Sequence, residues 1–331
     1  MTRILVTGGA GYVGSVSVEA LLADGHDVVV LDDLTTGHRA AVPSGATLRE
    51  GSYTDLVATT RLLQEHAIEA ILHCAARSLV GESIADPSRY YQENVAGGIA
   101  LLEAAREAGV TRFVFSSTAA VYGVPDTTPI PEDAPLRPIN PYGESKRTVE
   151  GALAWYGRAY GLRSVSLRYF NVAGATPTLG EVHRPETHLI PNVLAAAEGS
   201  ADLTIFGDDY PTPDGTCLRD YIHVADLADA HARAIVATAP GDPRTDEALV
   251  CNLGNGGGFS IREVVTAAER VVGTAIPVRI GPRRAGDPPV LVARSTRAEE
   301  VLGWRPQRPG LEAMVGSAWE WRRAHPDAYG D

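Results

Sequence analysis

The chain has 331 residues, of which 44% are hydrophobic and 21% charged, which suits one large α/β domain or two closely joined ones. Its net charge of −12 and the lack of any Lys/Arg run argue against a nucleic-acid-binding surface, so a phosphate site would have to be built locally from backbone amides and a few arginines. No apolar run approaches the ~20 residues of a membrane span, and the nine histidines form no paired zinc-type motif, so we expect neither a membrane segment nor a metal.

The first predicted element is a short apolar strand at residues 4–6. Met1 runs almost directly into it, so we expect no signal peptide. The chain has three cysteines, which form no metal-binding spacing and cannot all pair, and this usage is typical of a reducing cytoplasm. They are Cys74, Cys217 and Cys251.

A glycine-rich turn separates this strand from a predicted helix at residues 13–23. Glycines at such a place permit the tight turn, let backbone amides approach a pyrophosphate and let the helix pack on the strand. The helix N-terminus adds a favourable partial charge. We therefore expect a dinucleotide phosphate site here, and the residues assigned to it are Gly8, Gly11, Tyr12, Val13 and Gly14.

A second predicted strand at residues 27–31 runs into Asp32 and Asp33. A carboxylate at the end of this strand can accept hydrogen bonds from an adenosine ribose and would repel a 2′-phosphate. The pattern therefore favours NAD over NADP as the cofactor.

Short Val/Ile/Leu runs continue to alternate with helical stretches through the first half. Alternation of this kind predicts a parallel sheet covered on both faces, that is, an α/β fold of the Rossmann-type doubly wound class. The further expected strands are 70–73, 112–116 and 164–168, and the further expected helices are 56–65 and 90–108.

Serine and threonine follow the predicted strand at residues 112–116. They fall at the carboxyl edge of the sheet, where ligands bind in such folds. Thr118 offers a hydroxyl that could hold a substrate oxygen, and Ser116, two positions earlier, is expected to contact the cofactor.

Tyr142 and Lys146 lie four positions apart, which places them on the same face of a helix. A free tyrosine titrates near pH 10 and is a poor base at neutrality. We expect the nearby ammonium to favour the phenolate and lower the pKa of Tyr142. The pair would then exchange a proton with a substrate hydroxyl.

After Asn171 the chain becomes richer in proline and turn residues, without a low-complexity linker or an internal repeat. We expect an NAD-binding domain at residues 1–171 and a smaller C-terminal α/β substrate-binding lobe at 172–331, which could exchange segments with the first. The helices expected in this lobe are 190–197, 224–237, 261–271 and 311–323.

Taken together, these motifs resemble the extended short-chain dehydrogenase/reductase family, and within it the branch of UDP-glucose 4-epimerases. The resemblance covers nearly the whole chain. Its most specific portions are residues 5–14, 80–83, 140–146, 168–171, 209–216 and 219–223.

The resemblance implies an activity: NAD-dependent inversion of C4 of a UDP-hexose, interconverting UDP-glucose and UDP-galactose through a 4-keto intermediate. Tyr142 would be the base at the O4 hydroxyl, Thr118 would align that hydroxyl, and Lys146 would bind the nicotinamide ribose and keep Tyr142 ionisable. It also implies a homodimer.

The resemblance implies further site residues. The additional cofactor contacts are Tyr53, Ala75, Asn94, Ser116 and Tyr169. The substrate contacts are Asn171, His188, Leu189, Arg219, Tyr221 and Arg284 around the diphosphate, Phe206 beside the uracil, Asp287 on the uridine ribose and Leu291 beside the sugar.

Three departures from the family pattern matter. Ser52 stands where an aspartate is usual, so the adenine contact could be weaker, and Arg77-Ser78 replaces a stretch that often carries a lysine. Leu291 falls where residue size governs acceptance of N-acetylated sugars, and its bulk favours the unsubstituted hexoses.

Rival activities within the family differ in the residues that they require. Dehydratases need an acid–base carboxylate beside the threonine, whereas this chain has Ala119-Ala120 there. A 4-epimerase acting on UDP-N-acetylglucosamine or UDP-glucuronate remains an alternative. A non-catalytic NAD-binding scaffold would have no need of the tyrosine, lysine and threonine set.

Overall fold

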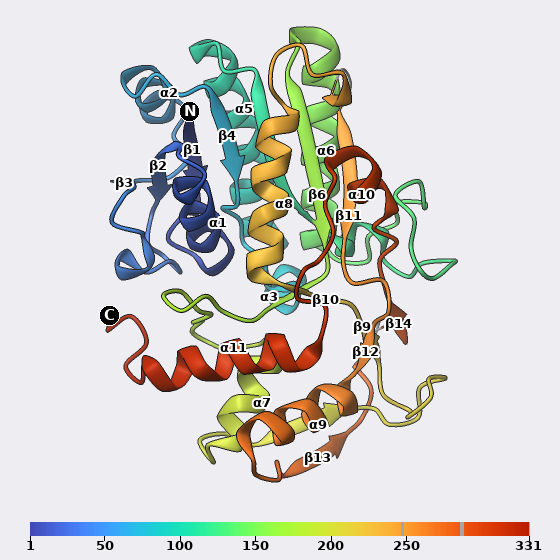
Figure 1. The fold of residues 1–331 in the computed structure, drawn as a ribbon. Helices are drawn as coiled ribbons and strands as arrows, with labels where there is room; N and C mark the ends of the chain where they lie inside the picture. The colour runs from blue at the N-terminus through green and yellow to red at the C-terminus, as the bar shows by residue number, and fades with distance from the viewer. Residues whose placement is uncertain (246–247, 285–287, 331) are drawn as a thin grey trace.

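A computed structural model describes residues 1–245, 248–284 and 288–330, and within them seven parallel strands form the central sheet, in the order β11-β6-β5-β4-β1-β2-β3 (Figure 1). The predicted Rossmann-type doubly wound sheet is confirmed. The strands are β1 (Arg3–Thr7), β2 (Asp27–Asp32), β3 (Thr47–Glu50), β4 (Ala70–His73), β5 (Arg112–Thr118), β6 (Arg163–Tyr169) and β11 (Leu249–Leu253).

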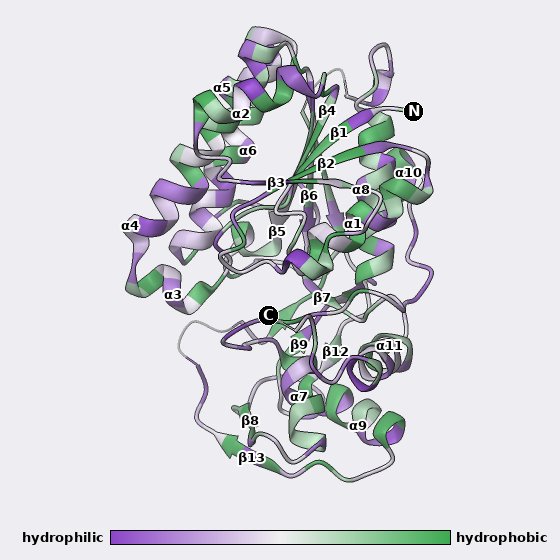
Figure 2. Ribbon diagram, turned by 90° about the vertical axis from the view of Figure 1, so that its left-hand side faces the viewer, coloured by the Kyte–Doolittle hydropathy of each residue, from purple (hydrophilic) through white to green (hydrophobic). Residues whose placement is uncertain are grey.

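The central strands are apolar on both faces because helices cover both. Ile4 and Val6 of β1 pack toward one helical layer, and Leu5 between them packs toward the other. Figure 2 shows the resulting hydrophobic strands lying between the two layers. The first layer holds α1 (Tyr12–Ala23), α8 (Val224–Ala237) and α10 (Thr296–Leu302), and the second holds α2 (Leu56–Glu65), α5 (Gly97–Ala108) and α6 (Pro141–Tyr160).

The strand order reverses direction between β1 and β4. Ligands of doubly wound sheets bind outside the carboxyl ends of the strands at such a switch point. The glycine turn after β1 and the backbone of Ala75 after β4 meet there, since the Ala75 amide donates to the Thr7 carbonyl at 3.0 Å.

The second half of the chain builds a smaller group of elements at the carboxyl end of the sheet (Figure 1). Its helices α7 (Leu189–Ala197), α9 (Ile261–Val272) and α11 (Leu311–Ala324) share one hydrophobic core. Its short strands pair as β7 (Asn171–Ala173) with β10 (Tyr221–His223), β8 (Leu203–Phe206) with β13 (Val278–Gly281), and β9 (Leu218–Arg219) with β12 (Phe259–Ser260) and β14 (Val290–Leu291).

Segments beyond residue 171 also contribute to the main sheet and to its first helical layer. Strand β11 joins the main sheet beside β6, and α8 packs against α1. The division of the chain into domains at residue 171 stays a prediction. No helix in the described part of the chain is long and apolar enough to cross a membrane.

The helix expected at 90–108 is interrupted. It consists of the end of α4 (Pro87–Tyr90), a π-helical turn η2 (Tyr91–Ala96) and α5. Such turns insert one residue into the helical repeat and leave no signature in the apolar pattern. The remaining elements are α3 (Val80–Ala85) and the 3₁₀ turns η1 (Arg39–Ala41), η3 (Ala119–Tyr122) and η4 (Pro243–Thr245).

Candidate active site

The glycine turn has the geometry that the sequence predicts. Gly8 adopts φ +72°, a region that favours glycine, and its amide donates to the Leu31 carbonyl at 2.9 Å. A Cβ on Gly14 would lie 2.0 Å from the Gly8 oxygen, so only glycine lets α1 pack this closely on the turn.

The residues of this turn fit a pyrophosphate. Gly11 precedes α1 and makes no side-chain cap, so the first-turn amides of the helix are left for another acceptor. A Cβ on Gly11 would meet only the Gly8 oxygen within 4 Å, at 3.4 Å, so the space beside the turn is open. Val13 lies in the same first helical turn, whereas the Tyr12 hydroxyl donates to the Gly174 carbonyl at 2.6 Å.

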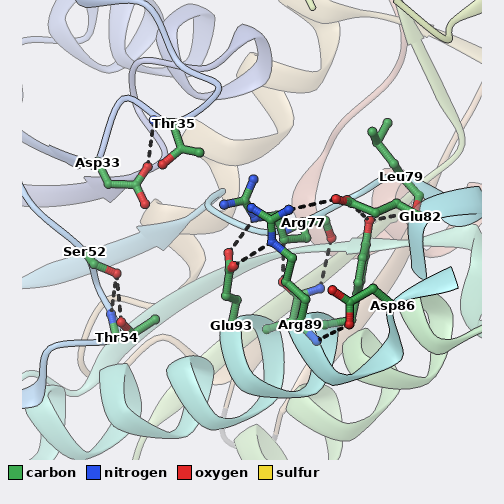
Figure 3. A network of polar contacts seen from close by, with 12 residues as sticks. Asp33, Thr35, Ser52, Thr54, Arg77, Leu79, Glu82, Asp86, Arg89 and Glu93 are labelled. Atoms are coloured by element: carbon green, nitrogen blue, oxygen red, sulfur yellow. Dashed lines mark hydrogen bonds and ion pairs between the residues drawn. The ribbon is translucent and has the colours of Figure 1, made fainter. Parts of the chain in front are cut away.

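The two aspartates after β2 have different surroundings. Asp32 is buried and accepts from the amides of Ala10 and Leu34, each at 2.9 Å. Burial raises the pKa of Asp32, while these two hydrogen bonds oppose the shift. Asp33 is exposed and accepts from the Thr35 amide at 2.9 Å (Figure 3). Asp32 therefore shapes the glycine turn, a role that sequence reasoning missed, and Asp33 is the more open carboxylate.

Asn94 connects two segments that border the same end of the sheet. Its buried side chain exchanges two hydrogen bonds of 2.9 Å with the backbone of Arg77 and donates to the Ser145 hydroxyl at 3.0 Å. The Arg77 guanidinium pairs with Glu93 at 2.5 Å, and the Tyr53 hydroxyl donates to the Glu93 carbonyl at 2.9 Å.

Figure 3 shows the contacts of Arg77 and Ser52, two of the residues that depart from the family pattern. Arg77 lies beside Glu93, which also pairs with Arg89 at 3.0 Å. Ser52 is hydrogen-bonded to the Thr54 hydroxyl at 2.8 Å.

The predicted proton-transfer residues lie at the start of α6. Asn140 caps this helix by accepting from the Gly143 amide at 2.8 Å, which fixes the first turn. The Tyr142 phenol lies near Thr118, at the carboxyl end of β5, and the Thr118 hydroxyl acts to lower the pKa of the phenol. Lys146 is buried, and its Nζ donates to the Ser116 carbonyl at 2.8 Å.

The expected lowering of the Tyr142 pKa is wrong for this arrangement. Burial raises the pKa of Tyr142, and only the hydrogen bond from Thr118 opposes it. The reason is the place of the ammonium group: Lys146 Nζ is bound to the Ser116 carbonyl and lies 4.7 Å from the centroid of the Phe115 ring. Burial lowers the pKa of Lys146 itself to about 8.

Buried polar side chains also contact Ser116, whose carbonyl accepts from Lys146. The Ser116 hydroxyl contacts Nε2 of His231 at 3.0 Å and acts to lower the pKa of the nearby Tyr169 phenol. It also lies 3.3 Å from Sγ of Cys74. Burial raises the pKa of Tyr169 well above its usual value, with the Tyr142 phenol adding to the shift.

Four of the predicted substrate residues meet through short strands. Asn171 and Tyr221 are register partners in β7 and β10, and Arg219 and Leu291 are partners in β9 and β14. Leu291 packs against the cluster that contains Val121, shortly after Thr118. At Leu291, the second half of the chain therefore approaches η3, the turn that follows Thr118.

Asp220 organises this region and was missed by sequence reasoning. Its buried carboxylate accepts from the amides of Asn255 at 2.7 Å and Ala293 at 2.9 Å, which holds two loops around the strand that carries Arg219. An aspartate directly after Arg219, in a segment that otherwise reads as a short strand, is the signal that could have indicated it.

The remaining predicted substrate residues fall in separate places. The Arg284 guanidinium lies 4.0 Å from the Phe206 ring centroid, and Phe206 is 37% exposed. Leu189 begins α7, where it packs on the core of the second half, and Nδ1 of His188 lies 2.8 Å from Glu181 Oε1. Asp287 lies outside the described residues.

Comparison with known proteins places this site in a family. The model of the NAD dependent epimerase/dehydratase family matches residues 4–251. The chain belongs to that family. A UDP-glucose 4-epimerase of Streptomyces lividans is 53% identical over 331 residues, which cover 99% of this chain and 98% of the relative.

Two solved structures extend the likeness to three dimensions. A UDP-glucose 4-epimerase from Brucella ovis in complex with NAD has a TM-score of 0.92 and 45% identity, covering 96% of this chain and 98% of its own. One from Bifidobacterium longum in complex with NAD⁺ and UDP has a TM-score of 0.92 and 35% identity, covering 99% of this chain and 100% of its own.

Proposed function

We propose that this chain is an NAD-dependent enzyme that inverts C4 of a UDP-hexose, interconverting UDP-glucose and UDP-galactose through a 4-keto intermediate. The observation that carries the proposal is that Tyr142, at the start of α6, meets Thr118 at the carboxyl edge of the sheet, where the Thr118 hydroxyl lowers the pKa of the phenol, with Lys146 one helical turn away. End-to-end similarity to UDP-glucose 4-epimerases supports it.

The glycine turn and its neighbours would hold the cofactor. Backbone amides at the start of α1 suit the pyrophosphate, and Asp32 ends β2, with Asp33 directly after it, where the adenosine ribose is expected. When bound, NAD supplies an acceptor that takes hydride from C4 of the sugar and gives it back to the opposite face. Tyr53, Ala75, Asn94, Ser116 and Tyr169 are the further proposed contacts.

Tyr142 is the proposed proton carrier at the O4 hydroxyl. The Thr118 hydroxyl is near enough to the phenol to lower its pKa, so we propose that the two groups hold one substrate oxygen between them. Because burial raises the Tyr142 pKa, ionisation needs a neighbouring cation. Lys146, one turn along α6, is the proposed source of that charge, although its Nζ donates to the Ser116 carbonyl in the structure and does not lower the Tyr142 pKa from there.

The second half of the chain would bind the UDP group. Arg219 and Arg284 suit the diphosphate because a guanidinium meets phosphate oxygens with a planar fork. Asn171, Leu189 and Tyr221 would line the same region, Phe206 would flank the uracil and Leu291 the sugar. Asp287 remains the expected ribose partner, and we assign His188 to another site below.

The acid–base carboxylate that a dehydratase requires beside the threonine is absent from this sequence. Ala119 and Ala120 follow Thr118 as the turn η3, so no carboxylate stands next to the threonine in sequence. The bulk of Leu291 favours unsubstituted hexoses, which leaves UDP-N-acetylglucosamine and UDP-glucuronate as the rival substrates.

We further propose a homodimer in the cytoplasm. All three cysteines are free thiols, which supports a reducing compartment. Light scattering of the purified protein would test the dimer.

The test of activity is to incubate the purified protein with UDP-galactose and no added cofactor. We expect UDP-glucose to form, since the cofactor is held tightly and is not consumed. A parallel panel with UDP-N-acetylglucosamine and UDP-glucuronate ranks the substrates. Absence of turnover with every UDP-hexose would contradict the proposal.

A further inference from the structure

Four side chains converge in the loop that precedes α7. Glu181, His183, Glu186 and His188 each offer one oxygen or nitrogen, and these four atoms lie within 4.8 Å of one another. The sequence was expected to bind no metal, because its nine histidines form no paired zinc-type motif. The path of the loop, not the spacing, brings the side chains together.

The distances between these atoms are those of ligands around a single ion. Nδ1 of His188 lies 2.8 Å from Glu181 Oε1 and 3.2 Å from Glu186 Oε1. Nδ1 of His183 lies 3.2 Å from the same Glu181 oxygen and 3.8 Å from Glu186 Oε2. A tetrahedral zinc ion with bonds of about 2.0–2.1 Å would separate its ligands by about 3.3 Å, within the span of these values.

A second observation concerns the direction of His183. Its Nδ1 is buried and makes no hydrogen bond of normal geometry, although Glu181 Oε1 is only 3.2 Å away. The Glu181 side chain is 8% exposed. A buried nitrogen that faces two carboxylates at ion-pair distance, with neither contact having hydrogen-bond geometry, points to the space between them, as a ligand would.

We propose that Glu181, His183, Glu186 and His188 form a closed, structural Zn²⁺ site. Two imidazoles favour zinc over calcium and magnesium, which prefer oxygen ligands only. Two carboxylates and two neutral imidazoles balance the charge of the ion. Four protein ligands leave no open position, so the site is structural and not catalytic.

The metal-free alternative is a pair of imidazolium–carboxylate contacts. The carboxylates raise the pKa of His183 to about 9 and of His188 to about 10 against the opposing effect of burial. In that state two protons occupy the place of the ion, and zinc would displace both. The experiment must therefore distinguish a bound ion from two ion pairs.

The proposed zinc site lies in a loop that contacts several other segments of the chain. The loop contacts the segment after β2 through His38 Nε2, 3.3 Å from the Val182 carbonyl, and the C-terminal segment through the Tyr329 hydroxyl, which donates to the Gly180 carbonyl at 2.9 Å. The chain enters the loop at Gly174, which accepts from Tyr12 of the glycine turn. Zinc would thus fix a loop that joins the second half of the chain to the first.

The test uses the full-length protein without a polyhistidine tag, which would itself bind zinc. After incubation with Zn²⁺ and gel filtration, metal analysis should give about one zinc per chain. Removal with EDTA should lower Tm by several degrees, on the order of 5 °C, and added Zn²⁺ should restore it. The proposal does not depend on the enzymatic activity.

Matched variants separate ligation from general stability. His183→Ala and Glu181→Gln should lose both the zinc and the Zn²⁺-dependent rise in Tm, whereas His66→Ala, at the end of α2, should keep both. Less than about 0.1 zinc per chain in the wild type, or an unchanged rise in Tm in His183→Ala, would overturn the site and leave the ion pairs. Should either variant fail to fold, the wild-type metal content and EDTA response still decide.

Discussion

The phenol of Tyr142 has two opposing neighbours. The buried surroundings disfavour its ionised form, while the Thr118 hydroxyl stabilises that form by hydrogen bonding. Lys146 is held at its place by the Ser116 carbonyl and the Phe115 ring. The proton acceptor and its cation are therefore fixed by different elements, since β5 positions the lysine head group and the cap of α6 positions the tyrosine.

Tyr142→Phe should lose most of the turnover while NAD and UDP binding persist, because the substitution removes only the hydroxyl. General acid–base groups contribute about 10²–10⁴-fold, so kcat should fall by that range. Turnover of UDP-galactose and equilibrium binding of UDP measure the two effects. Tyr91→Phe, an exposed tyrosine on η2, is the matched control and should keep normal kcat. A near-normal kcat in Tyr142→Phe would refute the assigned role.

At the scale of elements, His231 of α8 links helix α1 of the first layer to strands β5 and β6 of the central sheet. Its Nδ1 contacts the Ser17 hydroxyl of α1 at 3.0 Å, and its Nε2 contacts the Ser116 hydroxyl of β5 at the same distance. The Tyr169 ring of β6 lies edge-on to the imidazole, with the two ring centroids 6.4 Å apart. The histidine is fully buried, and burial lowers its pKa to about 3.

His231 should make stability depend on pH. A histidine that titrates at 6.5 when unfolded and at about 3 when folded binds its proton mainly in the unfolded chain between these values, so its contribution is present above pH 6.5 and is lost as the pH falls toward 3. Between pH 7 and pH 5 the loss should be about 2 kcal/mol. Urea unfolding of the wild type and His231→Gln at both pH values measures it. The wild type should lose more stability than the variant, and equal losses would contradict the burial argument.

Elements whose signals are local could be predicted from the sequence, and those that depend on distant partners could not. The helices α2 and α8 and strand β4 have the expected bounds because period, capping and apolar runs determine them. Strands β9 and β14 have only two residues each, and the partner of Arg219 is Leu291, far along the chain. No local pattern specifies such a pairing.

The same distinction holds for the candidate site. The spacing of Tyr142 and Lys146 and the glycine turn were recognisable because a helix and a strand–turn–helix unit fix them. The turn-shaping role of Asp32, which binds Ala10, depends on how β2 lies beside β1. The lysine contact with the Ser116 carbonyl likewise depends on the tertiary fold, which is why the pKa of Tyr142 was expected in the wrong direction.

At the scale of the whole molecule, the two halves meet where the sugar is expected. Ile130, from the chain after η3, pairs with Ala293 in an isolated bridge, which ties the catalytic side of the sheet to the segment after β14. Leu291 of β14 packs on the same cluster as Ile130 and Val121. The size of one side chain from the second half can therefore set the room beside Thr118 in the first.

Leu291→Ser should shift specificity toward N-acetylated sugars, because the shorter side chain leaves room for the acetyl group. Removing a few buried carbons changes discrimination by about 10-fold or more, so the ratio of kcat/KM for UDP-N-acetylglucosamine over UDP-glucose should rise by that order. Val290→Ser is the matched control, since adjacent strand residues face opposite sides. An unchanged ratio in Leu291→Ser would place the size filter elsewhere. An equal rise in both variants would indicate general loosening of β14, and only a rise confined to Leu291→Ser assigns the filter to that side chain.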